Sequence, residues 1–287
     1  MSKYDFLLEI EEILKTRPEI KGASVSSNVY MKNNDTECYG ITVFTDPERI
    51  SPVFYIDSFY DDYCRKKLTI EEIGDKILES YRSVVPEAQA HSNISLDFED
   101  CKDNIAFRLV SLKKNKRFLE NTPHVIYLDL AVYFVVIYKA DDDGIESIKV
   151  TYDLIDSWEK TSGDLLKLAK VNTPRLFPMV VKTLSDVLCI ENLGFDLLLL
   201  SNSHFVYGAS VMLYVDEMKR IAKVFEEDFY VIPSSVHEVL IMPKSKVDDI
   251  KEINDMIRSI NDEHLISTDI LSDRAYLYDS KENRFHF

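Results

Sequence analysis

The sequence predicts an α+β protein with mixed, largely antiparallel sheets and packed helices, arranged as two lobes over residues 1–103 and 104–287. Apolar residues recur at helical spacing in several segments, and strand-like apolar runs lie between them without strict alternation, which favours this class. A length of 287 residues with 46% hydrophobic content suffices for one large core or two smaller ones. Residues 87–103 are polar and lack sustained periodicity, so we expect the lobe boundary there.

In the N-terminal lobe, helical spacing predicts a first helix over residues 4–15, with Pro18 just past its end. Strand-like runs follow at residues 23–32, 38–45 and 53–56. The turn chemistry of Asn33-Asn34-Asp35-Thr36 joins the first two runs as a hairpin. Thr69-Ile70-Glu71-Glu72 is a capping box that begins a second helix, which we expect to end at Pro86.

In the C-terminal lobe, strands are predicted at residues 105–110, 130–138, 145–150, 195–200, 275–278 and 285–287, and helices near 154–158, 164–171, 208–225 and 247–260. The run 130–138 is apolar on both alternating faces, as in a strand that is buried on both sides. Asn172-Thr173-Pro174 is expected to end the preceding helix, because the residue before a proline is disfavoured in helical geometry.

Residues 228–242 carry the densest group of chemically capable side chains, where two β-type runs flank Pro233-Ser234-Ser235-Val236-His237-Glu238. A serine nucleophile needs a histidine base and an orienting acid within reach, so Ser234, Ser235, His237 and Glu238 are candidate catalytic residues. Known triads are assembled from distant segments, however, and no G-x-S-x-G elbow is present. We therefore favour a structural turn in which the serines bond backbone amides.

The sequence gives no reason to expect a metal or a cofactor. His237-Glu238 begins like a zinc-protease helix, but residue 241 is Ile instead of the second histidine. Only seven glycines occur, and neither GxGxxG nor GxxxxGK[ST] is present, so nucleotide binding through such loops is disfavoured. Asn172 and Arg175 are kept as candidate ligand-binding residues beside the central segment.

The formal net charge of −16 repels phosphate backbones and anionic membranes, so nucleic-acid and membrane partners are disfavoured. A protein partner is expected, with a basic one favoured, and the candidate contact residues are Asp57, Asp61, Asp62, Asp141, Asp142 and Asp143. The alternative is that the acidic surface only keeps the protein soluble. We expect an acidic binding or regulatory protein, such as an inhibitor or immunity-type protein that acts on a basic or nucleic-acid-handling partner. A hydrolase centred on residues 233–238 is the alternative function.

The cysteines are widely spaced without a CxxC pair, which indicates free thiols in a reducing compartment: Cys38, Cys64, Cys101 and Cys189. The first residues lack the basic segment and apolar core of a signal peptide. The longest near-apolar run, residues 125–138, is shorter than a membrane span and is interrupted by Asp129. These features predict a cytoplasmic protein, and its oligomeric state is not indicated.

Several phrases occur together in this chain: Ile105-Ala106-Phe107-Arg108-Leu109, Pro123-His124, Leu128-Asp129-Leu130, Asn172-Thr173-Pro174-Arg175-Leu176-Phe177-Pro178, Gly208-Ala209, the segment 233–238, and Leu271-Ser272-Asp273 with Tyr276 and Tyr278. In this combination the chain resembles an uncharacterised bacterial domain-of-unknown-function family of anaerobic Firmicutes and, more loosely, the YtpQ-like family. The resemblance is strongest over residues 104–279 and weak in the N-terminal third. It implies a bacterial cytoplasmic origin and carries no catalytic activity with it.

Overall fold

The computed structural model describes residues 1–20, 22–44, 53–90, 95–141, 144–183, 185 and 197–287. The chain forms two compact units: unit 1 is Met1–Lys32 with Thr36–Ser95, and unit 2 is Asn33–Asp35 with Leu96–Phe287. In both, helices pack on sheets whose described strand pairs are all antiparallel, so the predicted α+β class is confirmed. Separate domains over residues 1–103 and 104–287 stay a prediction. In the part of the chain that is described, no helix combines the length and apolar character that a membrane crossing requires.

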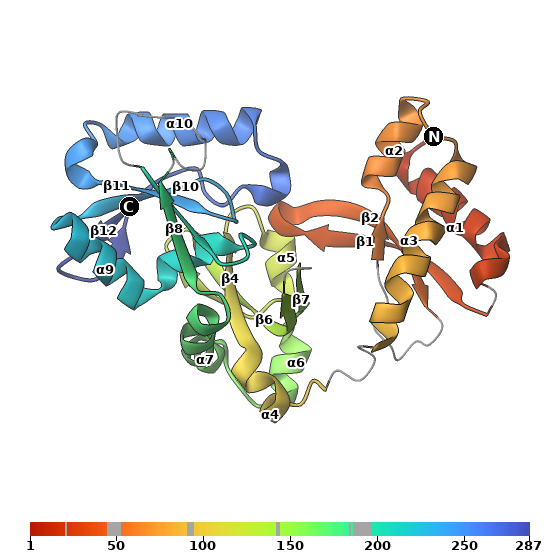
Figure 1. The fold of residues 1–287 in the computed structure, drawn as a ribbon, viewed down its shortest axis with the longest axis horizontal. Coiled ribbons are helices and arrows are strands. Elements are labelled where there is room, and N and C mark those ends of the chain that lie inside the picture. Colours follow the sequence, from red (N-terminus) through yellow and green to blue (C-terminus); the bar gives the residue numbers. More distant parts are fainter. Residues whose placement is uncertain (21, 45–52, 91–94, 142–143, 184, 186–196) are drawn as a thin grey trace. The chain divides into compact units, whose positions relative to one another are not determined.

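Unit 1 contains a three-stranded sheet in the order β1-β2-β3. Its elements are α1 (Lys3–Thr16), η1 (Pro18–Ile20), β1 (Ser24–Lys32), β2 (Thr36–Phe44), β3 (Val53–Tyr55), α2 (Asp57–Cys64) and α3 (Ile70–Ala90). Helix α1 packs against the β1–β2 hairpin and against α3 (Figure 1). The predicted capping box is present, because the N–H of Thr69 donates to Oε2 of Glu72 (2.8 Å) and the N–H of Glu72 donates to Oγ1 of Thr69 (3.2 Å).

The described strands of unit 2 form two antiparallel sheets. The four-stranded sheet has β4 (Ile105–Ser111), β6 (Leu130–Asp141) and β5 (His124–Tyr127) in that order, with β7 (Gly144–Lys149) also paired to β6. The six-stranded sheet has, in order, β13 (Arg284–His286), β12 (Tyr276–Asp279), β10 (Phe229–Pro233), β11 (Val239–Pro243), β9 (Leu198–Asn202) and β8 (Met179–Thr183). The two apolar runs that flank the central segment are therefore adjacent strands, β10 and β11.

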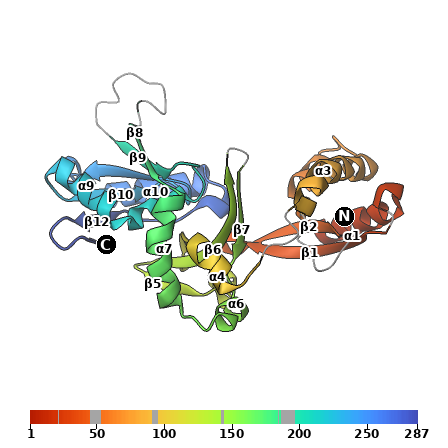
Figure 2. The ribbon, with the colours of Figure 1, turned by 60° about the horizontal axis from the view of Figure 1, so that its bottom comes forward.

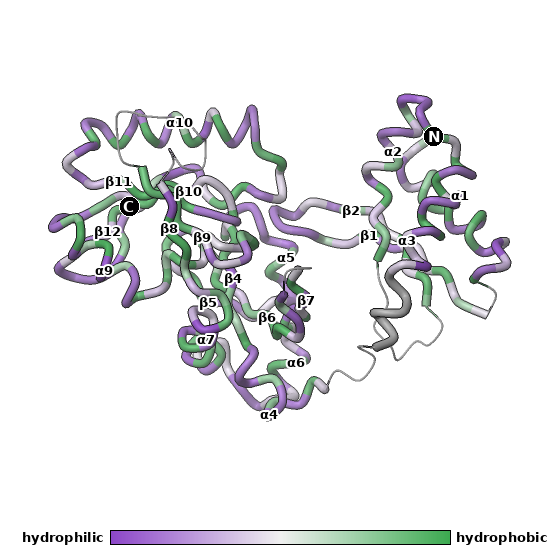
Figure 3. Tube along the Cα trace, viewed as in Figure 1, coloured by the Kyte–Doolittle hydropathy of each residue, from purple (hydrophilic) through white to green (hydrophobic). Residues whose placement is uncertain are grey.

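Among the described residues, the helices of unit 2 are η2 (Asn33–Asp35), α4 (Phe98–Cys101), η3 (Lys102–Asn104), α5 (Lys116–Glu120), α6 (Tyr152–Ser157), α7 (Ser162–Leu176), η4 (Gly208–Leu213), α9 (Val215–Phe225), η5 (Lys244–Lys246), α10 (Ile250–Glu263) and η6 (Ser267–Asp269). Helix α7 packs along β4 and β5 (Figure 2). The first eight residues of β6 are buried, as predicted for a strand covered on both faces, and hydrophobic residues follow β4 and β6 in Figure 3. Successive residues of β6, such as Tyr133 and Phe134, belong to different hydrophobic clusters.

Two prolines lie inside helices that they were expected to end. Helix α3 continues past Pro86 to Ala90, and α7 continues past Pro174 to Leu176. A proline inside a helix removes one backbone donor, which contacts elsewhere can compensate. In α7 the hydroxyl of Tyr214 donates to the carbonyl oxygen of Phe177 (2.9 Å), which holds the last turn. The predicted helix 208–225 is interrupted at the same Tyr214, between η4 and α9.

Residues 33–35 of unit 2 do more than form a turn. The carboxylate of Asp35 accepts the backbone N–H groups of Arg117 (2.9 Å) and Phe118 (2.8 Å), which caps the start of α5. Asn34 donates its N–H to Oδ1 of Asn115 (2.8 Å), and Nδ2 of Asn115 donates back to Oδ1 of Asn34 (2.8 Å). Asn34 has a φ of 58°, a left-handed conformation that asparagine tolerates better than most residues.

Candidate functional site

The segment 233–238 forms the connection between β10 and β11, and its hydrogen bonds run both within the segment and to neighbours such as Asp269, whose carbonyl oxygen accepts the N–H of Val236 (2.8 Å). The N–H groups of Ser234 and Ser235 both donate to the carbonyl oxygen of Glu238, at 3.3 and 3.2 Å. Oγ of Ser235 accepts the N–H of His237 (3.0 Å), and Oγ of Ser234 donates to Oε1 of Glu238 (3.4 Å). These bonds are typical of a structural turn in which serine side chains satisfy backbone groups.

The ring of His237 faces groups other than the two serines. Its Nδ1 accepts the N–H of Tyr207 (3.3 Å), and its Nε2 lies 3.6 Å from Oδ1 of Asp269. A Cβ at Gly208 would lie 2.4 Å from the carbonyl oxygen of His237, so glycine permits this close approach. The structure therefore brings His237 to Tyr207 and Asp269 and does not aim it at Ser234 or Ser235.

Tyr207 links the central segment to β4. The centre of its ring lies 5.8 Å from the centre of the His237 ring. The guanidinium carbon of Arg108 lies 4.1 Å from the centre of the same tyrosine ring. Arg108 forms no ion pair with any residue that the structure describes. Burial raises the pKa of Tyr133, the neighbour of Arg108 in the β4–β6 register. Sequence reasoning missed Arg108, Tyr207 and Asp269 as neighbours of His237, because no local pattern joins these separate segments.

The two predicted ligand-binding residues of α7 bind backbone instead. Nδ2 of Asn172 donates to the carbonyl oxygens of Lys102 (2.8 Å) and Ile105 (3.1 Å). The guanidinium of Arg175 donates to the carbonyl oxygen of Asp103. These bonds fix α7 to the chain that leads into β4. A ligand-binding role for either residue stays a prediction.

The predicted partner-binding aspartates are mostly in ion pairs where they are described. The pairs are Asp57 with Lys3 (3.0 Å), Asp62 with Lys67 (3.3 Å) and Asp141 with Lys139 (3.4 Å). Asp61 is exposed, and Asp142 and Asp143 lie outside the described residues. Asp57 also accepts the N–H of Tyr39 (3.2 Å). Each of these three carboxylates is offset locally by a lysine, and the net charge of −16 already counts those lysines.

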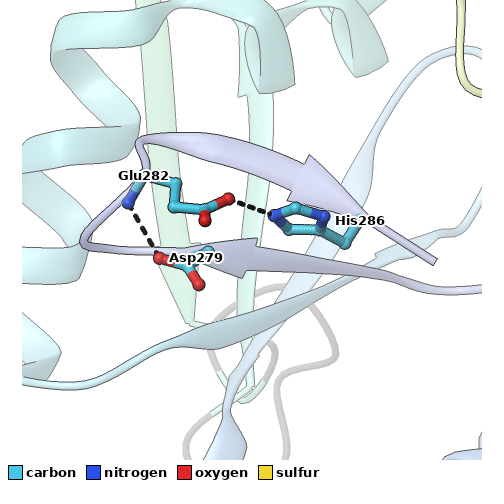
Figure 4. Close-up of side chains that lie close together, drawn as sticks. All are labelled: Asp279, Glu282 and His286. Carbon is cyan, nitrogen blue, oxygen red and sulfur yellow. Dashed lines mark hydrogen bonds and ion pairs between the residues drawn. The ribbon is translucent and has the colours of Figure 1, made fainter.

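A potential metal-binding group lies on the β12–β13 hairpin, where ligand atoms of Asp279, Glu282 and His286 lie within 4.8 Å of one another (Figure 4). Oε2 of Glu282 lies 3.1 Å from Nε2 of His286. Nε of Arg284 donates to the same Glu282 oxygen (2.6 Å) and lies 3.3 Å from the same His286 nitrogen. A cation would have to displace this guanidinium, so the residues present fit a metal poorly.

A cavity of about 110 Å³ lies between the two sheets of unit 2. Its lining is Phe107, Val125, Tyr127, Val132, Leu166, Lys170, Met212, Leu213, Val215, Met218, Tyr278, Asn283 and Phe285. Lys170 lies one turn after Leu166 on α7, and because it is exposed and also lines the cavity, it lies at the cavity's edge. Lys170 forms no ion pair within the described part of the chain. No sequence pattern predicts this cavity, because its walls come from many separate elements.

The comparisons with known proteins bear on the family alone. No curated protein matches the chain, and no solved structure matches it. A model of a family of unknown function matches residues from both units. The predicted resemblance to a domain-of-unknown-function family is confirmed at that level. The chain therefore belongs to the family of unknown function DUF5688, whose model matches residues 3–280.

Proposed function

We propose that this protein is a binding protein whose unit 2 holds a small apolar molecule with a carboxylate or similar anionic group. The observation that carries this proposal is the unpaired amine of Lys170 at the edge of an otherwise largely apolar cavity. Ligand sites commonly combine apolar walls with a few polar groups that orient the ligand. The cavity would take the apolar part of the ligand, and Lys170 would select an anionic end over a cationic one.

The walls supply the affinity and the lysine supplies the selectivity. Met212 and Met218 are unbranched and adaptable, which suits a site that must accommodate an alkyl chain. Each methylene removed from water contributes about 0.8 kcal/mol. The volume of about 110 Å³ favours a short chain over a large ring system. Because Lys170 is exposed, its attraction for a carboxylate is screened by water, and we expect a modest preference.

Isothermal titration with hexanoate, hexanol and hexylamine at equal ionic strength tests this proposal. Hexanoate should bind most tightly and hexylamine most weakly. The Lys170→Gln variant should lose the preference and keep hexanol binding, while Val215→Trp, at the exposed edge of the cavity, should weaken all three. Lys167→Gln is the matched control, because Lys167 lies on the same helix, pairs with Asp164 (3.1 Å) and does not line the cavity. Equal binding of hexanoate and hexylamine by the unsubstituted protein would contradict the proposal.

Our second proposal is the one expected from the sequence, that the protein binds a basic protein partner. One surface of α10 favours it. Met256 and Ile260 lie one turn apart on this helix and are 49% and 40% exposed. The next residue, Asn261, is buried and donates to the carbonyl oxygen of Ser272 (3.0 Å). The exposed Glu263 follows Ile260 by three residues on this helix, and the exposed Glu252 precedes Met256 by four, so both lie on the same side of α10 as the apolar pair. An apolar surface with acidic neighbours suits a basic amphipathic segment of a partner.

A basic amphipathic helical peptide provides the probe for this second proposal. It should bind at low salt and weaken as salt rises. Ile260→Lys should abolish binding, whereas Val224→Lys on α9 should not, although Val224 is 78% exposed. Binding that is indifferent to salt, or equally lost in both variants, would count against a specific acidic surface on α10.

The hydrolase alternative has less support, because the ring of His237 meets Tyr207 and Asp269 instead of a serine hydroxyl. It stays a prediction, as do a cytoplasmic location, a bacterial origin, a YtpQ-like relationship and an inhibitor or immunity-type role.

A further inference from the structure

We propose that unit 2 contains a second, separate site in which Arg108, Ser210 and Thr173 bind one oxyanion of a carboxylate or phosphate group. These residues line a small cavity of about 10 Å³, with Arg108 on β4, Thr173 on α7 and Ser210 on η4. Space of this size admits about one oxygen atom. The rest of the ligand would therefore lie outside the cavity, and the site would recognise a terminal oxyanion instead of a whole molecule.

The hydroxyl of Ser210 points to a ligand atom at this position. Ser210 is 2% exposed, and its Oγ is buried with no hydrogen-bond partner. Buried hydroxyl groups in folded proteins are nearly always hydrogen-bonded, so a buried hydroxyl without a partner calls for an explanation. An oxyanion in the cavity that Ser210 lines would accept its proton.

Thr173 adds a second donor. Its Oγ1 accepts the backbone N–H of Phe107 (3.0 Å), so its acceptor role is taken. None of the described hydrogen bonds uses the proton of this hydroxyl. Thr173 is 2% exposed, and it lines the same cavity as Ser210. Two buried hydroxyl donors without acceptors favour an anion over a cation.

Arg108 supplies the positive charge. It is the one residue of β4 that is not fully buried, and it has no ion pair within the described residues. Its guanidinium carbon lies 4.1 Å from the ring centre of Tyr207, which also lines the cavity. A guanidinium over an aromatic ring can still direct the N–H donors of its own plane to an oxyanion, and Arg108 has further donors besides the one that reaches the hydroxyl of Tyr133.

His237 does not line the small cavity, but it holds the backbone of Tyr207, whose ring contacts Arg108. Tyr207 has a φ of 52°, a left-handed conformation that is uncommon for a bulky residue. Its N–H is held by Nδ1 of His237 (3.3 Å), and Gly208 follows where a Cβ would lie 2.1 Å from Oγ of Ser201. The segment 233–238 therefore fixes the backbone of Tyr207, and the Tyr207 ring supports Arg108. His237 is a positioning residue in this proposal.

The oxyanion site is distinct from the apolar cavity of the proposed function. Phe107 lines both cavities, but Lys170 lines only the larger one and Arg108 only the smaller one. Asn202 also lines the smaller cavity, but its amide is already used, because Oδ1 accepts the N–H of His204 (3.0 Å) and Nδ2 donates to Val206 O (2.8 Å). Anion binding here can therefore succeed or fail independently of hexanoate binding at Lys170.

Calorimetric titration with inorganic phosphate and, separately, with acetate, each against chloride at equal ionic strength, tests the site and identifies the preferred oxyanion. At least one of the two should bind, and Arg108→Gln should weaken that binding about tenfold. Arg108→Lys should recover part of it. The control Arg220→Gln should change nothing, because Arg220 is exposed on α9 and pairs with Glu217 (3.0 Å).

Ser210→Ala gives the sharpest result, because its expected effects on thermal stability and on anion affinity have opposite signs. Removing a buried hydroxyl without a partner should raise the melting temperature of the free protein while weakening anion binding several-fold. For the positioning role, His237→Ala should weaken binding, and His237→Asn should restore it in part through an amide oxygen that can accept the Tyr207 N–H. Failure of both anions to bind, or unchanged affinity in both Arg108→Gln and Ser210→Ala, would overturn the proposal.

Discussion

The hydroxyl of Tyr276 donates a hydrogen bond of 2.7 Å to Oδ1 of Asp129. Tyr276 lies on β12 of the six-stranded sheet, and Asp129 lies in the turn between β5 and β6 of the four-stranded sheet, so this bond joins the two sheets of unit 2. Ser272 donates to the other oxygen of Asp129 (3.3 Å). Burial, with the nearby carboxylate, raises the pKa of Tyr276, so its hydroxyl stays protonated as a donor at neutral pH.

Tyr276→Phe should therefore lower the free energy of unfolding by about 1.5–3 kcal/mol, because it removes a hydrogen bond to a charged acceptor. Urea denaturation at neutral pH measures the change. Tyr278→Phe is the matched control, because its hydroxyl donates to the neutral Oδ1 of Asn283 at a longer distance of 3.3 Å. We expect the control to lose less stability. Equal losses in the two variants would show that the Asp129 bond has no special weight.

The fold class could be predicted because the signals for single elements are local. The stripe of α1, the Thr69 capping box and the β1–β2 turn each depend on residues a few positions apart. The bond between Asp129 and Tyr276 joins residues 147 positions apart, and no periodicity encodes it. For the same reason, the sequence could identify Asn33-Asn34-Asp35-Thr36 as a turn but not its capping of α5.

The candidate site was only partly predictable. Residues 233–238 were recognisable as a polar connection between two strands, and the structure confirms the strands. The partners of His237 are Tyr207, just before η4, and Asp269 of η6, and Arg108 comes from β4, so the group exists only after the sheets pair. Local rules also misplaced the ends of α3 and α7, because tertiary contacts can offset the bond that a proline removes.

The capping box at the start of α7 should make stability depend on acid pH. Hydrogen bonds from Thr161, and then from Lys167, lower the pKa of Asp164 from its ordinary 3.8 to about 2. A lowered pKa means that the folded state favours the carboxylate, so this stabilisation is present above about pH 4 and is lost as pH falls towards about 2. Asp164→Asn should lower the melting temperature at pH 7, and its difference from the unsubstituted protein should shrink below pH 4.

Thermal melts at successive pH values between 7 and 2.5 check this expectation. The control is Asp156→Asn on α6, because that side chain makes none of the described hydrogen bonds. A melting-temperature difference for Asp164→Asn that stays constant down to pH 2.5 would contradict the assignment of the effect to the capping carboxylate.

If the segment 233–238 is a structural turn, substitution of its serines should lower the stability of the fold. Ser235→Ala removes the acceptor for the N–H of His237 (3.0 Å) and should lower the free energy of unfolding by about 0.5–1.5 kcal/mol. Ser234→Ala should cost less, because Oγ of Ser234 makes only a 3.4 Å contact with Oε1 of Glu238. Urea denaturation distinguishes the two variants, and their order follows from the quality of the bond that each one loses.

A fluorophosphonate probe examines the same serines for reactivity. Neither Ser234 nor Ser235 should be labelled, because an activated serine needs a histidine nitrogen that accepts its proton. The Nδ1 of His237 already accepts the N–H of Tyr207, its Nε2 faces Asp269, and Ser235 is only 7% exposed. Stoichiometric labelling of either serine that disappears in His237→Ala would require the ring to turn away from both partners, and it would establish the hydrolase alternative over the structural turn.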